Sequence, residues 1–396
     1  MSLATREAAA VPWRSRTVQL VLASTLLAPL GVPLVSPALP VVRDAFGLTD
    51  AQASLLITSY FLVGIVLSPF IGALADRIGR RRVLVGSLLV FGLAGGIIAL
   101  APSYGVVLAI RVVQGTAAAG IFVSTVTIIG DAFEGVQRNA VLGVNNAVLS
   151  AGAAAYPLVG GVLAAIAWNA PFLAYLAALP VAVVAAVVLE ETPSSRTVRG
   201  RAYLRGAVAA LAGSRALVYY GAAFLTELLL FGTVFTALPF LLSESFGLTP
   251  VGIGLVVTAA ELSSVVVSTQ NGRLAGFLSN GQLVTAGFAC YGVGLLVAWL
   301  AETSLVVGAG VVVVGAGLGL SMPTVDAAIS DLVTGEYRAG ALSLRNSVTF
   351  LGRATGPVLF AGLAITTGYG PLLFAAGVVA FGFSAIVSLA TGLRER

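Results

Sequence analysis

The sequence predicts an all-α membrane protein with twelve transmembrane helices, arranged as two repeats of six. Three observations lead to this prediction. Hydrophobic residues make up 58% of the 396 residues and charged residues only 9%, too few to cover a water-soluble chain of this length. Apolar runs of about 20 residues, the length that a helix needs to cross a bilayer, follow one another along the chain. Several segments also recur in a constant register, as Phe46 and Phe246 do.

Short polar breaks between the apolar runs set the boundaries of the predicted helices. These helices are 17–41, 51–74, 83–101, 104–130, 139–165, 170–190, 216–243, 250–270, 282–301, 304–330, 339–366 and 371–392. The longest break is rich in arginine and lies near the middle of the chain. It divides the chain into an N-terminal six-helix bundle (1–190), a cytoplasmic linker (191–215) and a C-terminal six-helix bundle (216–396).

The two predicted halves repeat short motifs. The repeated residues are Phe46-Gly47-Leu48-Thr49 with Phe246-Gly247-Leu248-Thr249, Asp131 with Asp331, Arg138 with Arg338, and Gly152 and Pro157 with Gly352 and Pro357. Chance similarities would not keep one register across half a chain. Two six-helix repeats, related by an axis along the membrane normal, are the layout of secondary transporters that alternate access around a midplane site.

The distribution of arginine predicts the orientation of the chain. The net charge of +5 comes entirely from arginine, since the chain has no lysine. Arg43 is the only arginine in an expected external loop, whereas the others outside the helices lie in expected cytoplasmic segments. By the positive-inside rule both termini are cytoplasmic. We therefore expect a multi-pass protein of the cytoplasmic membrane whose basic residues face anionic lipid headgroups, with no nucleic-acid partner.

Four motifs carry a resemblance to a known family. They are Gly72-Ala73-Leu74-Ala75-Asp76-Arg77-Ile78-Gly79-Arg80 after the second helix, Arg111 with Gln114 in the fourth, Gly143, Gly152, Pro157 and Gly161 in the fifth, and Leu30-Gly31, Pro37 and Pro40 in the first. The chain resembles the major facilitator superfamily, and within it the twelve-helix drug:proton antiporters. It departs from the antiporter pattern in two ways: Tyr156 stands where a glycine is usual, and the first helix carries no acidic residue.

The resemblance implies a conformational switch at the cytoplasmic side. It assigns Asp76, Arg80, Gly152, Pro157 and Gly161 to this switch. In the resembled family, the residue that matches Asp76 lies beside the N-terminus of the eleventh helix when the cytoplasmic side is closed. Glycines in the fifth helix allow close helix packing, and a proline inside a helix removes a backbone hydrogen bond.

Six ionisable residues fall inside predicted helices, where a central charge costs roughly 2.5 to 3.5 kcal/mol and normally faces a cavity or a partner. They are Arg111, Glu227, Glu261, Asp326, Arg345 and Arg353. All three acids lie in the second half, and none has a charged counterpart in the first. The repeat is therefore broken where transport chemistry would have to be.

We predict that Glu227 and, after it, Glu261 couple transport to protons, because a buried carboxyl favours its neutral form. Residues of the predicted substrate cavity are Arg111, Gln114, Phe224, Phe231, Phe235 and Arg353. Aromatic rings around Glu227 suit a lipophilic cation, and Arg353 is placed to neutralise Glu227 or Glu261. Asp326 and Arg345 lie at similar depth on adjacent helices and are predicted to form a structural ion pair.

The predicted function is proton-coupled export of a small amphiphilic or cationic compound by alternating access. One alternative is proton-coupled uptake of a small organic anion, with Arg111 and Arg353 binding the anionic group. Another is a transporter-like membrane sensor or scaffold. We expect no enzymatic activity, no metal and no cofactor, since the chain has no histidine and a single cysteine. We also expect a monomer.

Overall fold

The computed structural model describes residues 11–65, 71, 74–75, 77–191, 213–333 and 337–392. Within these residues the chain is helical and forms no strand, and the predicted all-α fold is confirmed. Eleven helices of the described part are long and apolar enough to cross a membrane. The remaining predicted helix, 51–74, is α-helical over Asp50–Leu62, and part of it lies outside the described residues.

The first half contains six spans, some of them built from several helical pieces. Its elements are α2 (Arg16–Leu27), η1 (Ala28–Gly31), η2 (Ser36–Ala38), α3 (Leu39–Phe46), α4 (Asp50–Leu62), α6 (Arg80–Ile98), α7 (Tyr104–Ala132), α8 (Gly135–Ile166), α9 (Ala170–Leu173), η3 (Ala174–Ala177) and α10 (Ala178–Val188).

The second half follows the same order with longer uninterrupted helices. Its elements are α12 (Ser214–Leu229), the π-helical segment η4 (Leu230–Ala237), α13 (Leu238–Glu244), α14 (Pro250–Leu274), α15 (Asn280–Trp299), α16 (Ser304–Asp331), α17 (Arg338–Thr367) and α18 (Tyr369–Gly392).

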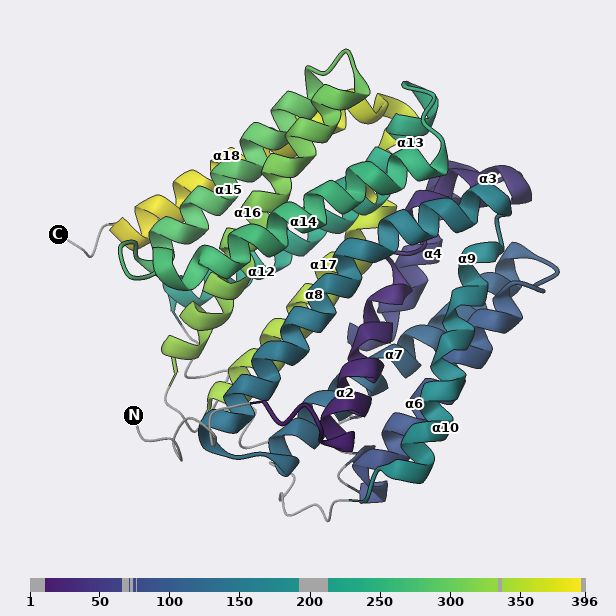
Figure 1. Cartoon of the computed structure of the whole chain (residues 1–396). Coiled ribbons are helices and arrows are strands. Elements are labelled where there is room, and N and C mark those ends of the chain that lie inside the picture. Colours follow the sequence, from purple (N-terminus) through teal and green to yellow (C-terminus); the bar gives the residue numbers. More distant parts are fainter. Residues whose placement is uncertain are drawn as a thin grey trace.

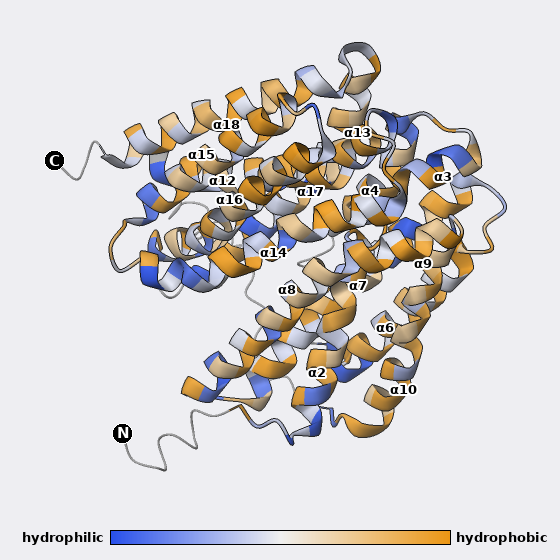
Figure 2. Cartoon of the chain, turned by 45° about the horizontal axis from the view of Figure 1, so that its top comes forward, coloured by the Kyte–Doolittle hydropathy of each residue, from blue (hydrophilic) through white to orange (hydrophobic). Residues whose placement is uncertain are grey.

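The helices of the two halves run side by side (Figure 1), and the halves contact each other through α8 against α14 and α4 against α17. We call the end that carries Arg80, Arg138, Arg215 and Arg338 the arginine-rich end, and the opposite end the arginine-poor end. Figure 2 shows the two groups of helices meeting near α3, α4 and α13 and diverging toward the end where the N-terminus lies. The molecule is therefore joined at its arginine-poor end.

The repeated Phe-Gly-Leu-Thr motif forms the same turn in both halves. Gly47 directly follows α3 and Gly247 lies three residues beyond the end of α13, with φ values of 63° and 62°, a left-handed conformation that glycine adopts without strain. Thr49 and Thr249 then cap the next helix by accepting a hydrogen bond from a backbone N–H three residues later. A shared local sequence thus produces a shared helix connection.

The first span departs from the prediction of one continuous helix over 17–41. Its backbone leaves the α-helical form between Ala28 and Ala38, passing through η1, a turn and η2. Pro29, Pro33 and Pro37 fall in this stretch, and a proline has no N–H to donate. Carbonyl groups of the stretch therefore need partners outside the span.

The seventh span contains the π-helical segment η4, which directly follows α12. Pro239, at the start of α13, cannot donate to the carbonyl of Phe235. The hydroxyl of Ser36 in the first half donates to that carbonyl at 2.8 Å. The irregular parts of the first and seventh spans are thus bonded to each other, and π segments are frequent near functional sites.

Candidate functional site

Glu227 of α12 and Arg353 of α17 form an ion pair inside the second half. The Nε and Nη2 atoms of Arg353 donate to the two carboxylate oxygens of Glu227 at 3.0 and 2.7 Å. The Glu227 side chain is 1% exposed, whereas that of Arg353 is 28% exposed. A paired, bidentate arrangement of this kind is the strongest form of arginine–carboxylate contact. Arg353 therefore covers Glu227 and is itself the accessible member of the pair.

Two glycines of α17 allow this pair to form. A Cβ atom at Gly352 would lie 2.6 Å from the carbonyl oxygen of Phe224 and 3.1 Å from Cβ of Glu227. A Cβ atom at Gly356 would lie 2.6 Å from the carbonyl oxygen of Leu228. Since real Cβ atoms do not approach that closely, only glycine lets α17 lie directly against α12 at this height.

Three phenylalanine rings surround the guanidinium of Arg353. Its central carbon lies 5.7, 5.5 and 5.6 Å from the ring centroids of Phe61, Phe231 and Phe350. The Phe61 and Phe231 rings also touch edge to face, with centroids 5.1 Å apart. Phe61 belongs to α4 of the first half, so these rings join the two halves around one cation. Sequence reasoning missed Phe61 and Phe350 because neither shares a helix with Glu227.

The other predicted aromatic residues lie further from the ion pair. Phe235 is buried and packs against Phe231, with ring centroids 5.0 Å apart. Phe224 is half-buried, and its backbone carbonyl faces Gly352. Of the three phenylalanines predicted from the spacing along the seventh span, only Phe231 contacts the charged groups directly.

Glu261 of α14 is a second buried carboxylate near this pair. Its side chain is 7% exposed, and it lies within electrostatic range of both Glu227 and Arg353. In the part of the chain that the structure describes, no hydrogen bond or ion pair reaches its carboxylate. Glu227, Glu261 and Arg353 thus form a group of two acids and one base, which we call the charged triad.

Arg111 and Gln114 of α7 are fully buried in this conformation, and their role in a substrate cavity stays a prediction. The Arg111 guanidinium donates to the carbonyl of Gly31 at 2.6 Å, to that of Leu56 at 3.1 Å and to the side-chain oxygen of Gln114 at 2.8 Å. Tyr175 donates to the carbonyl of Leu30 at 2.8 Å. In the irregular first span, Arg111 therefore satisfies the carbonyl of Gly31, and Tyr175 satisfies that of Leu30.

The Asp326 and Arg345 side chains form an ion pair of 2.6 Å between α16 and α17. Asp326 is 45% exposed and Arg345 11% exposed. Arg345 lies on the same helix as Arg353, two turns nearer to the arginine-rich end. The two charges of the pair balance each other, and Asp326 also lies within electrostatic range of Glu227 and Arg353.

A family model for the Major Facilitator Superfamily matches residues 21–240 and 220–396, and so covers the described spans of both halves. The chain belongs to this superfamily. It is therefore a membrane transporter, as its motifs predicted.

Among curated relatives, the transporter is 27% identical over 357 residues to the bacillibactin exporter of Bacillus subtilis (strain 168), a match that covers 85% of this chain and 87% of the relative. It is 29% identical over 171 residues to the quinolone resistance protein NorA of Staphylococcus aureus (strain MRSA252), covering 43% of this chain and 44% of that protein. Both relatives are named for export or drug resistance.

Solved structures share the fold at low sequence identity. A bacterial homologue of the human lysosomal transporter Spinster, in an inward-facing and unoccupied conformation, has a TM-score of 0.75 at 17% identity and is matched over 96% of both chains. The nucleoside transporter NupG has a TM-score of 0.79 at 11% identity, with 94% of this chain and 98% of that chain covered.

The motif residues of the transporter take different positions. Gly161 packs on the carbonyl of Pro250, and Gly254 packs on that of Pro157, so both contacts join α8 to α14 between the halves. Gly152 instead lies within the first half, against Pro29. These close approaches leave no room for a side chain at Gly161.

Arg80, another member of the predicted switch, lies at the arginine-rich end. Arg80 is buried and forms an ion pair with Asp131 of α7. Asp76 lies outside the described residues. Tyr156, which replaces the usual glycine, donates its hydroxyl to the carbonyl of Leu26 at 2.7 Å and so ties α8 to α2 within the first half.

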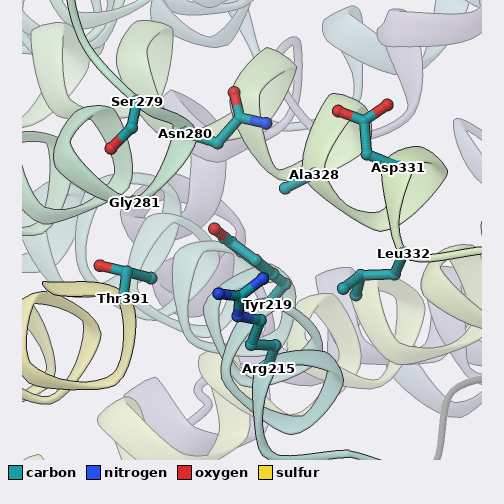
Figure 3. A pocket seen from close by; sticks show the side chains of 9 residues that line it. All are labelled: Arg215, Tyr219, Ser279, Asn280, Gly281, Ala328, Asp331, Leu332 and Thr391. Carbon is teal, nitrogen blue, oxygen red and sulfur yellow. The ribbon is translucent and has the colours of Figure 1, made fainter. Parts of the chain in front are cut away.

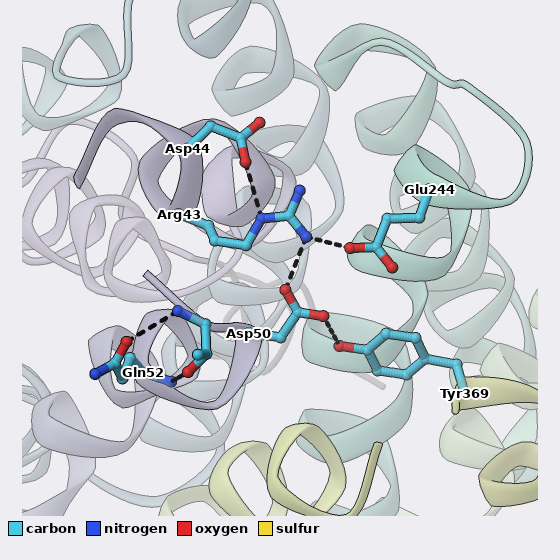
Figure 4. A network of polar contacts seen from close by, with 7 residues as sticks. Arg43, Asp44, Asp50, Gln52, Glu244 and Tyr369 are labelled. Atoms are coloured by element: carbon cyan, nitrogen blue, oxygen red, sulfur yellow. Dashed lines mark hydrogen bonds and ion pairs between the residues drawn. The ribbon is translucent and has the colours of Figure 1, made fainter. Parts of the chain in front are cut away.

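A polar network joins the halves of the transporter at the arginine-poor end (Figure 4). Arg43 donates to Asp44 at 2.9 Å and to Asp50 at 2.8 Å, and it forms an ion pair with Glu244 of the second half. Tyr369 of the second half donates to the other oxygen of Asp50 at 2.5 Å. We call these residues the Arg43 network.

A small pocket lies at the arginine-rich end of the second half, among the ends of four helices (Figure 3). Its lining residues are Arg215, Tyr219, Ser279, Asn280, Gly281, Ala328, Asp331, Leu332 and Thr391. Glu227 lies about 18 Å further along α12 than Arg215, at 1.5 Å per residue. The pocket is therefore separate from the charged triad.

Proposed function

We propose that this transporter exports a small amphiphilic cation in exchange for protons. The observation that supports the proposal is the charge of the triad. With Glu227 and Glu261 ionised and Arg353 positive, the group carries one negative charge that no described residue compensates. A buried charge without a partner is costly in a medium of low dielectric constant.

Either one proton or one monovalent cation neutralises this group, whereas binding both at once leaves it positively charged. The two ligands are therefore mutually exclusive at the site. When each binding event also permits the change between the two open states, exclusion of this kind produces exchange of one ligand for the other. That is the thermodynamic requirement for an antiporter.

We assign the proton to Glu261 in the conformation described here. Arg353 donates both of its hydrogen bonds to Glu227 and so compensates the negative charge of that carboxylate. Glu261 is buried without such a partner, and a proton removes its charge. This assignment reverses the preference for Glu227 that the sequence alone supported.

The direction of transport follows from the orientation that we propose. Basic residues gather at the end where the halves diverge, and the positive-inside rule places that end in the cytoplasm of a plasma membrane, together with both termini. The cargo then enters the divergent side from the cytoplasm. Relatives named as an exporter and a resistance protein agree with this direction.

Uptake of an organic anion receives less support. Arg111 is committed to backbone carbonyls and Arg353 to Glu227, so both arginines that would hold an anion have other partners. An anion would also add negative charge to a triad that already carries an excess of it.

The test is transport in proteoliposomes under an imposed pH gradient, with matched organic cations and anions as cargo. We expect the cation to accumulate in the acidic compartment in exchange for protons, and Glu261→Gln, which fixes this group in its neutral form, to abolish this accumulation. Accumulation of the anion instead, or full gradient-driven cation flux in Glu261→Gln, would contradict the proposal.

A further inference from the structure

We infer that Glu227 and the rings of Phe61, Phe231 and Phe350 form a binding site for an organic monocation, and that Arg353 occupies this site in the unloaded transporter. We call the three rings and the carboxylate the cation cage. The inference rests on the proposed function, because it names the cargo class of the same site.

The cage already holds a cation in the structure. The guanidinium of Arg353 has one carboxylate partner, Glu227, and three aromatic rings at 5.5 to 5.7 Å. A guanidinium is planar and weakly hydrated, and it is attracted to ring faces in the same way as alkylated or aromatic ammonium ions. The groups that satisfy Arg353 would equally satisfy such a cargo.

Arg353 also controls access to the cage. Its side chain is 28% exposed while that of Glu227 beneath it is 1% exposed, so a ligand reaches Glu227 only after the guanidinium has moved aside. The arginine side chain is long and flexible enough to do so. Nearby Glu261 offers the displaced guanidinium a second carboxylate, since the two groups already interact electrostatically. Exchange of partners would then keep every charge compensated.

The cage is shared between the halves, which connects its occupant to the conformational change. Phe61 lies on α4, whereas Phe231 and Phe350 belong to the second half. The hydroxyl of Thr58, one turn before Phe61, donates to the carbonyl of Ala354 at 2.9 Å, beside Arg353. A larger cation in place of the guanidinium must therefore displace rings from both halves.

A different explanation is that the rings only shield a permanent ion pair that holds α12 to α17. The two explanations predict different binding once Arg353 loses its charge. If the ion pair is permanent, removing the charge of Arg353 damages the contact between α12 and α17 and brings no gain in cation binding. A site blocked by its own arginine gains affinity for an external cation once that arginine is neutral.

The test is equilibrium binding of tetraphenylphosphonium to the purified transporter at a pH of about 8, where carboxyl groups of ordinary pKa are ionised. Tetraphenylborate, which has nearly the same shape and the opposite charge, is the probe control. If Arg353 occupies the cage nine-tenths of the time or more, Arg353→Met should raise the affinity for the cation about tenfold or more. The affinity for tetraphenylborate should not rise.

Four further variants separate the two explanations. Glu227→Gln and Phe231→Leu should each weaken binding of the cation. The double variant Glu227→Gln with Arg353→Met leaves the net charge of the triad as it is in the parent and should fold, yet bind the cation no better than the unmodified protein. Arg345→Met removes another arginine from α17, and breaks an ion pair outside the cage; it should leave the affinity unchanged.

Unchanged or lower affinity in Arg353→Met, with Arg345→Met and the double variant folded, would overturn the inference. So would equally tight binding in the double variant, because the gain would then come from space rather than from Glu227. Binding is measured without a pH gradient. If the cage binds the cation as expected but the transporter shows no proton-driven flux, only the proposed function is contradicted.

Discussion

Arg353 and Arg111, two arginines inside membrane-spanning helices, have different kinds of hydrogen-bond partner. Arg353 satisfies a carboxylate, whereas Arg111 distributes its donors over the carbonyls of Gly31 and Leu56 and the side chain of Gln114. Its guanidinium also lies 4.5 Å from the ring centroid of Tyr60. The fixed fork of five N–H groups makes this possible, and a lysine has no equivalent.

Arg111→Lys should therefore destabilise the transporter although it keeps the charge. Each buried carbonyl left without a donor costs about 1 to 3 kcal/mol, so the loss should be roughly 3 kcal/mol, measured by thermal unfolding in detergent. The control is Arg82→Lys, since the Arg82 side chain is 75% exposed. If the lysine variant is as stable as the parent and binds anions more weakly, Arg111 is a substrate ligand instead.

At the scale of the element, the position of α17 decides which carboxylate Arg353 meets. Gly352 and Gly356 bring this helix against α12, and Pro357 comes directly after them within the same helix. Gly352 and Pro357 were recognisable in the sequence as repeats of Gly152 and Pro157. The residues of α12 that Gly352 and Gly356 contact could not be predicted, because spacing along one helix does not show which helix lies opposite.

Gly352→Ala should separate α17 from α12 and break the Glu227–Arg353 pair. A methyl group 2.6 Å from the carbonyl of Phe224 forces the helices apart, at a cost of typically 1 to 3 kcal/mol for an overpacked site. Gly362→Ala, in the same helix with nothing within 4 Å, is the matched control and should be neutral or stabilising. Thermal unfolding of both variants tests this, and equal stability would contradict the assigned contact.

The sequence supports prediction of the helices better than of their irregular parts. Long apolar runs with few charges leave little choice but a membrane-spanning helix, and the confirmed fold follows from them. The non-helical stretch between Ala28 and Ala38 depends on donors from Arg111 and Tyr175, which lie far along the chain. Arg353 and its two candidate acids were found from their type and depth, whereas the choice of Glu227 depends on tertiary packing.

At the scale of the whole molecule, the Arg43 network connects the halves where the repeat is almost exact. Asp44 and Glu244 are repeat-related acids, and Arg43 bonds to both, together with Asp50. Two contacts of the network cross between the halves, that of Arg43 with Glu244 and that of Tyr369 with Asp50. A transporter that opens its arginine-poor end must break both, while the contacts of Arg43 with Asp44 and Asp50 can persist.

Glu244→Gln should therefore shift the conformational equilibrium toward opening of the arginine-poor end. The ion pair is partly exposed, with Glu244 44% accessible, so its loss is worth about 0.2 to 1 kcal/mol, or up to about a fivefold change in populations. Spin labels at Ser103 and Glu302, both exposed in loops of this end, should show a larger population of long distances.

Asp44→Asn is the control for this prediction, because it removes a contact of Arg43 within the first half alone. It should leave the distance distribution as it is in the parent. Equal shifts in both variants would mean that the network acts through local charge and not as a connection between the halves.

The central claim is that a proton and a cationic cargo compete for one negative charge of the triad, and proton release on binding tests it most directly. When tetraphenylphosphonium is added to the purified transporter in weakly buffered solution near neutral pH, about one proton should leave for each cation bound, since ligands that exclude each other must displace each other. Glu261→Gln, which fixes this group in its neutral form, should bind the cation more weakly and without this release. Saturable binding of the cation without proton release in the unmodified protein would contradict the claim. Undiminished proton release in Glu261→Gln would contradict it as well.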